Sequence, residues 1–92
     1  MSDINIPKPT LFSKPGCVQC NATLRYFNTH NIPFHYIDVT ESESAIDQVR
    51  DMGYTQVPVV VYNFEHFYGF RPDLLEKIRE AYAPLEEVQE AA

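Results

Sequence analysis

Residues 57–62, Val-Pro-Val-Val-Val-Tyr, form a continuous apolar run in a chain of 92 residues. A short run rich in β-branched side chains is typical of a strand that is buried on both faces of a sheet. The next strand-like segment, residues 66–68, follows after a turn at residues 63–65, which is too short for a parallel crossover. The sequence therefore predicts an antiparallel hairpin inside a sheet that other elements cover on both faces.

The rest of the chain alternates between strand and helix patterns. Cys20, Leu24 and Phe27 recur at the spacing of one helical face. The helix that carries them separates two strand patterns, which favours a right-handed parallel crossover. We expect an α/β fold with a four-stranded mixed sheet flanked by three helices, in the order β-α-β-α-β-β-α. The expected strands are 9–13, 34–39, 57–62 and 66–68; the expected helices are 17–30, one from Thr40 or Ser42 to Gly53, and one that begins at Pro72 or Asp73.

Composition limits the domain organisation and the partners. The chain is 45% hydrophobic, as a folded protein is, and its length allows one domain, which we expect over residues 1–83. Residues 84–92 are acidic and are expected to form a disordered tail. A net charge of -6 argues against nucleic-acid binding. Neither a secretory signal nor a membrane span of roughly 20 apolar residues is recognisable, so we expect a cytoplasmic monomer without a membrane partner.

Cys17 and Cys20 are the two cysteines of the chain, and they lie where a strand pattern changes to a helix pattern. Two cysteines are too few for a disulfide-rich scaffold or for a closed zinc site. A cysteine at a helix N-terminus faces unpaired N–H groups and the positive end of the helix dipole, which favour a thiolate. Lys14, three residues earlier, adds positive charge. We expect Cys17 to be the nucleophile and Cys20, on the apolar helix face, to be the resolving cysteine.

Two other interpretations of the cysteine pair remain open at this point. The cysteines could be incidental buried residues, although a C-x-x-C beside a βαβ pattern is a fairly specific redox signal. They could also bind a metal together with some of the three histidines. Because no histidine has metal-ligand spacing to the cysteines, we expect no metal site in one copy of the chain. These histidines are His30, His35 and His66.

Three motifs in the same order resemble the NrdH-redoxins, glutaredoxin-like members of the thioredoxin superfamily. They are residues 17–23 (Cys-Val-Gln-Cys-Asn-Ala-Thr), 56–61 (Gln-Val-Pro-Val-Val-Val) and 69–73 (Gly-Phe-Arg-Pro-Asp). The likeness covers roughly residues 8–82. It implies a thioredoxin fold, a cis Val57-Pro58 peptide bond, and electron transfer from thioredoxin reductase to the catalytic subunit of class Ib ribonucleotide reductase. It also implies that the chain binds no cofactor, since NADPH and FAD belong to the reductase.

The same motifs indicate which residues meet a partner. Without an N–H on Pro58, the backbone of the preceding residue is open to pair with an incoming peptide, whereas the simpler interpretation makes Pro58 the start of an edge strand. For Arg71 and its neighbours, the simpler interpretation is that they only begin a helix. The predicted partner-binding residues are Lys14, Val18, Gln19, Val57, Pro58, Phe67, Gly69, Phe70 and Arg71.

Residues 69–73 also bear on the choice of reductant. Glutaredoxins hold a glutathione carboxylate with N–H groups after a Gly-Gly pair, whereas here Phe70 is bulky, Pro72 lacks an N–H and Asp73 is negative. We therefore expect reduction by thioredoxin reductase. The alternative is a glutathione-dependent glutaredoxin or a general protein-disulfide reductase, and a zinc or iron–sulfur binding module is a third possibility. The chain departs from the family pattern in having Phe67-Tyr68 where Trp-Ser is usual.

Overall fold

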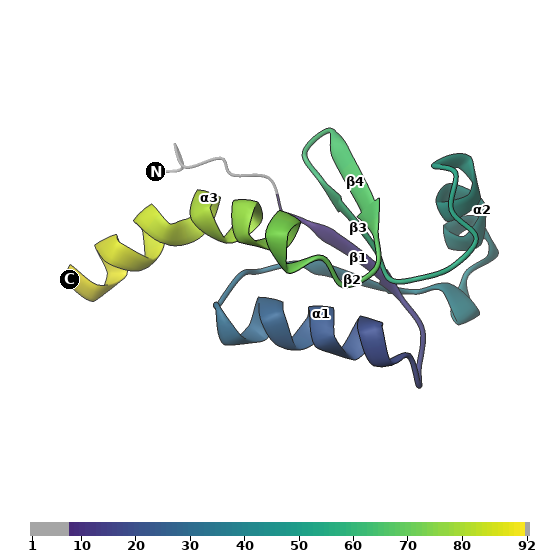
Figure 1. The fold of residues 1–92 in the computed structure, drawn as a ribbon, viewed down its shortest axis with the longest axis horizontal. Helices are drawn as coiled ribbons and strands as arrows, with labels where there is room; N and C mark the ends of the chain where they lie inside the picture. The colour runs from purple at the N-terminus through teal and green to yellow at the C-terminus, as the bar shows by residue number, and fades with distance from the viewer. Residues whose placement is uncertain (1–7, 92) are drawn as a thin grey trace.

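Four short strands form one mixed sheet in the order β2-β1-β3-β4 (Figure 1). The computed structural model describes the backbone of residues 8–91 and the side chains of residues 8–82. β1 is parallel to β2 and antiparallel to β3, and β3 is antiparallel to β4. The parallel crossover and the hairpin are thus confirmed. The strands are β1 (Thr10–Ser13), β2 (His35–Asp38), β3 (Val59–Tyr62) and β4 (Glu65–Tyr68).

Helices cover both faces of this sheet. Figure 1 shows α1 and α3 together on one face and α2 on the other. Ser42 is the N-cap of α2, and its hydroxyl oxygen accepts the N–H of Ala45 at 3.2 Å; Gly53, with φ +97, follows the end of the helix. A 3-10 turn that the sequence pattern does not indicate, η1, precedes α2. The helices are α1 (Val18–Thr29), η1 (Val39–Glu41), α2 (Glu43–Asp51) and α3 (Pro72–Ala91).

The hydrophobic core has one cluster on each face of the sheet. Val60 lies opposite Leu11 and packs with Phe27 of α1 and Leu75 of α3. Val59 lies opposite Phe12 and packs with α2. Both valines are fully buried, because adjacent residues of a strand point to opposite faces. This explains the continuous apolar run and gives the layered architecture of a thioredoxin fold, as the family resemblance implies.

α3 is longer than its apolar pattern indicates. Its helical backbone extends to Ala91 and includes residues 84–91, for which a disordered tail is expected from the sequence. Side chains after residue 82 lie outside the described part, so the division into a domain of residues 1–83 and a tail stays a prediction. Over the described residues, no helix combines the length and the apolar character that crossing a membrane requires.

Candidate active site

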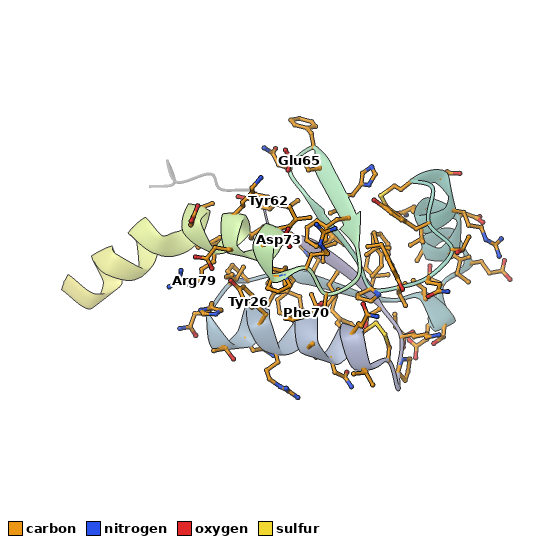
Figure 2. All side chains as sticks on the ribbon, viewed as in Figure 1. Tyr26, Tyr62, Glu65, Phe70, Asp73 and Arg79 are labelled. Atoms are coloured by element: carbon orange, nitrogen blue, oxygen red, sulfur yellow. A yellow bond between two sulfur atoms is a disulfide. The ribbon has the colours of Figure 1, made fainter. Side chains whose placement is uncertain are left out.

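Cys17 and Cys20 form a disulfide at the N-terminal end of α1 (Figure 2). Cys17 is the N-cap residue of the helix, in an extended conformation, and its Sγ accepts the N–H of Cys20 at 3.2 Å. The backbone N–H groups at a helix start have no partner within the helix and carry partial positive charge. The same groups favour a thiolate on Cys17 when the disulfide is reduced.

The two sulfurs differ in their access to solvent. Cys20 is 1% exposed, whereas Cys17 is half-buried and the next residue, Val18, is 83% exposed. A partner's sulfur can therefore approach Cys17, while Cys20 is covered by the core. This placement is the one expected from the sequence; the assignment of Cys17 as nucleophile and Cys20 as resolving cysteine stays a prediction.

The Val57-Pro58 peptide bond is cis, as the resemblance implies, and it lies beside the disulfide. The carbonyl oxygen of Val57 is 3.8 Å from Cys17 Sγ. Within residues 8–91, the N–H of Val57 makes no backbone hydrogen bond, so it can pair with an incoming peptide. Pro58 precedes β3, which lies between β1 and β4, and the alternative that it begins an edge strand is therefore wrong.

Gln19 joins the start of α1 to the loop that leads into α3. Its Oε1 accepts the N–H of Phe70 at 3.1 Å. The same oxygen is 3.1 Å from where a Cβ on Gly69 would stand, and Gly69 has φ +90. A side chain at this position would be strained and would press on Gln19. The N–H of Gly69 in turn donates to the carbonyl of Pro58 at 2.8 Å, so one loop holds both Gln19 and the proline segment.

The remaining predicted partner-binding residues are less uniform. The rings of Phe67 and Phe70 are half-buried and pack against the core between the sheet, α1 and α3, and Figure 2 labels Phe70 there. Arg71 is exposed and donates to both carboxylate oxygens of Asp73, at 3.3 and 3.1 Å. This hydrogen bonding lowers the pKa of Asp73. Lys14 is exposed just after β1.

Two polar residues beside the site were not identified from the sequence. Tyr68 donates its hydroxyl hydrogen to Oε1 of Gln56 at 3.0 Å, directly before Val57. Tyr68 is 36% exposed. The available signal was the departure from the family pattern at residues 67–68, which replaces a small side chain by a large phenol. The tyrosine therefore contributes to the surface around the disulfide that Phe67 and Phe70 were expected to form.

Two of the three histidines, His30 and His66, have partners other than the cysteines. His66 Nδ1 lies 2.8 Å from the hydroxyl oxygen of Tyr54, and His30 Nδ1 accepts from Nε of Arg79 at 3.1 Å. Among the described side chains, no three of His, Cys, Asp and Glu are grouped so that they could hold a metal ion.

The sheet, the helix order and the paired cysteines define a thiol–disulfide oxidoreductase of the glutaredoxin class, and a glutaredoxin family model matches residues 10–67. The glutaredoxin-like protein NrdH of Lactococcus lactis subsp. cremoris is 33% identical over 69 residues, which cover 75% of this chain and 96% of the relative. That of Escherichia coli K12 is 33% identical over 72 residues, 78% and 89% of the two chains. The chain therefore belongs to the NrdH-redoxins, a family of glutaredoxin-like proteins.

The structural comparison leads to the same family. The solved structure of E. coli NrdH-redoxin, described as glutaredoxin-like with a thioredoxin-like activity profile, has a TM-score of 0.73. It is 33% identical in sequence, and the match covers 76% of this chain and 92% of that one. The similarity thus includes nearly the whole of the relative.

Proposed function

We propose that this protein carries electrons from a thioredoxin reductase to a disulfide of the catalytic subunit of a class Ib ribonucleotide reductase. The observation that carries the proposal is the accessible Cys17 at the N-cap of α1, disulfide-bonded to the buried Cys20. Membership of the NrdH-redoxins supports the choice of partners. In this role the protein acts as a monomer in the cytoplasm.

The electron transfer takes two exchange steps. The Cys17 thiolate attacks one sulfur of the client disulfide; the client S–S bond breaks, a mixed disulfide forms and one client thiolate leaves. The Cys20 thiolate then attacks Cys17 Sγ and releases the second client thiolate. The client gains two electrons and takes two protons from solvent, and the protein is left with its Cys17–Cys20 disulfide.

The cycle closes when the reductase returns two electrons to this disulfide. In the proposal the chain binds no cofactor of its own, because FAD and NADPH in the reductase supply the electrons. The chain contributes the sulfur pair, the helix N-terminus that favours the Cys17 thiolate, and the open backbone of Val57 that positions the client.

The start of α3 supports thioredoxin reductase over glutathione as the electron source. An anion bound there needs free backbone N–H groups. The N–H of Phe70 already donates to Gln19, Pro72 has none, and Asp73 adds a carboxylate. A glutathione carboxylate at this position would meet few free donors, because the Arg71 guanidinium is already paired with Asp73.

Reduction of a client disulfide under two electron supplies tests the proposal. NADPH oxidation is followed with insulin or class Ib ribonucleotide reductase as the client, once with thioredoxin reductase and once with glutathione and glutathione reductase. We expect turnover with thioredoxin reductase and little with glutathione. Equal or faster turnover with glutathione would make the protein a glutathione-dependent glutaredoxin. The Cys17→Ser/Cys20→Ser variant gives the background rate in both assays.

A further inference from the structure

A groove of about 310 Å³ lies beside the redox pair, between α2 and the segment that leads into β3. Val57 connects the groove to the redox pair, because this residue lines the groove and its carbonyl oxygen is 3.8 Å from Cys17 Sγ. A peptide that pairs with the backbone of Val57 would direct a neighbouring side chain into the groove. Aliphatic side chains form much of its lining: Val39, Ile46, Val49 and Val57.

The charged residues that line this groove are both cations. Lys14 and Arg50 are exposed, and neither makes an ion pair or a side-chain hydrogen bond within residues 8–82. Arg71 and Arg79, by contrast, pair with two carboxylates of α3, Asp73 and Glu76. The acidic Asp51 of α2 lines a different groove. Positive charge therefore lies unpaired beside the disulfide of a chain whose net charge is -6.

We propose that this groove docks an acidic peptide segment next to the client disulfide, with an apolar side chain in the groove and carboxylates at Lys14 and Arg50. Charge complementarity argues for this partner, since a carboxylate is attracted to both cations and meets no acidic lining residue. The aliphatic lining favours an apolar side chain between or beside the acidic residues. The inference rests on the proposed disulfide reduction and specifies which client segments are reduced fastest.

Two synthetic peptides measure this selectivity. Each carries a Cys-x-x-Cys disulfide next to a leucine, flanked by two glutamates in one peptide and by two lysines in the other. The pre-reduced protein is mixed with a subsaturating amount of each at low salt, and single-turnover rates are recorded. Oxidation of the Cys17/Cys20 dithiol balances reduction of one peptide disulfide. We expect the acidic peptide to be reduced about tenfold faster, and this ratio to fall as salt is added.

Charge-reversed variants locate the source of the preference. Lys14→Glu/Arg50→Glu is expected to abolish or invert the rate ratio of the two peptides. The matched control, Arg25→Glu/Lys77→Glu, changes the net charge equally at exposed positions outside the groove and is expected to keep the ratio. Any change in the reactivity of Cys17 acts on both peptides alike, so the ratio isolates docking.

Binding without chemistry separates this inference from the proposed function. The same peptides with serine in place of cysteine are titrated into the oxidised protein, and the amide signals of Arg50 and Val57 are followed by NMR. Charge-selective binding without disulfide reduction would sustain the groove and overturn the proposed function. Equal rates for both peptides, or an equal loss of preference in the control variant, would overturn the groove while the reductase role stands.

Discussion

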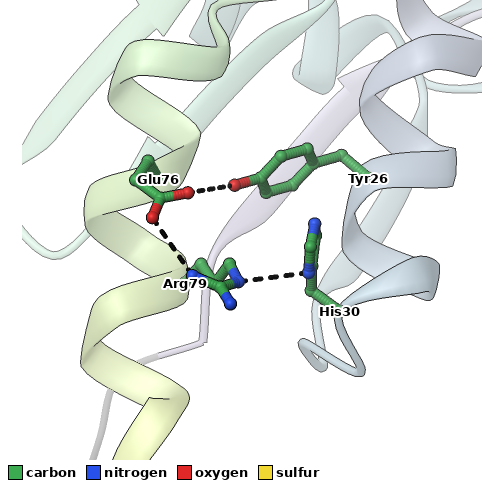
Figure 3. A network of polar contacts seen from close by, with 4 residues as sticks. All are labelled: Tyr26, His30, Glu76 and Arg79. Carbon is green, nitrogen blue, oxygen red and sulfur yellow. Dashed lines mark hydrogen bonds and ion pairs between the residues drawn. The ribbon is translucent and has the colours of Figure 1, made fainter.

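Contacts of two different kinds, one at each end of α1, join this helix to α3 and to the loop that leads into α3. At the disulfide end, Oε1 of Gln19 accepts the Phe70 N–H at 3.1 Å. At the other end, four side chains form a network between the two helices (Figure 3). Tyr26 donates to Glu76 at 2.9 Å, and Arg79 donates to both Glu76 and His30 at 3.1 Å.

The remote network is also the more enclosed of the two. The rings of Tyr26 and His30 lie 4.4 Å apart, and both residues are half-buried. Burial, together with the hydrogen bond to Glu76, raises the pKa of Tyr26 to about 12. At the disulfide end, Gln19 is exposed, and Val18 is almost fully so. The helix pair thus separates its tasks: side-chain contacts stabilise one end and leave the other end accessible to partners.

The largest expected effect lies at the disulfide end. Cys17→Ser removes the accessible sulfur and should lower client reduction by more than about 10³-fold, because serine is not ionised near neutral pH. Cys20→Ser should instead permit the first exchange and accumulate a mixed disulfide through Cys17. Coupled NADPH oxidation and mass spectrometry of the trapped species measure the two outcomes. A mixed disulfide through Cys20 would contradict the assignment of the nucleophile.

Breaking the remote network should affect stability and leave turnover unchanged. Glu76→Ala removes the acceptor for Tyr26 and the carboxylate that pairs with Arg79, and should lower the free energy of unfolding by about 1 kcal/mol. Urea unfolding of the oxidised protein measures the change, and Glu80→Ala, at an exposed position of the same helix, is the control. A fall in kcat/KM comparable to that of a disulfide-end variant would contradict the separation of tasks.

The network should also depend on pH. The folded state keeps Tyr26 protonated because its pKa is about 12, whereas in the unfolded chain the value is near 10. This contribution to stability is complete below pH 10 and is lost as the pH rises towards 12. The advantage of Tyr26 over Tyr26→Phe should therefore shrink over that range. Because water screens this partly exposed hydroxyl, the change should be about 1 kcal/mol, well below what the full shift would give.

Urea unfolding at pH 7, 10 and 11.5 tests this pH dependence. Both proteins carry Cys17→Ser/Cys20→Ser so that alkaline thiol chemistry does not interfere. A constant difference between them at all three pH values would show that Tyr26 does not titrate differently in the folded and unfolded states.

The smallest expected effect on stability is at Gln19. Gln19→Ala removes the acceptor of the Phe70 N–H, but water can reach this exposed group, so the loss should be about 0.5 kcal/mol. The KM for the client should rise as the loop that holds Gly69 and Pro58 loosens. Gln19→Glu keeps an acceptor oxygen and should retain the Phe70 amide shift in NMR spectra. An unchanged Phe70 shift in Gln19→Ala would exclude this bond in solution.

Local patterns in the sequence account for most of the fold. The apolar run of residues 57–62 predicted a strand between two layers, and Val59 and Val60 bury on opposite faces as expected. The change from strand to helix at Cys17 predicted a cysteine at a helix N-terminus, and the structure places it one residue before the helix, at the N-cap. The pattern missed η1, because a single turn capped by Asp38 has no periodicity, and it stopped α3 short of Ala91.

Residues of the site were predicted only where a sequence motif includes them. Gln19 was expected in the site from its place between the cysteines, but its bond to Phe70 joins residues 51 positions apart. Phe70 was expected at the partner surface, and yet its ring packs on the core. Tyr68 and Arg50 belong to no redox motif, and their roles depend on which segments the fold brings near Val57.

The sequence by itself determined the order of the elements, the chemistry of the cysteine pair and its place at a helix start, because these depend on residues close together in the chain. The tertiary structure decided which backbone donors are already satisfied, which cations are unpaired and which ring is buried. Those properties arise between segments distant in sequence, such as Cys17 and Val57, 40 positions apart. Hydrogen bonds and burial act over a few ångströms in space, and only folding brings such residues within that distance.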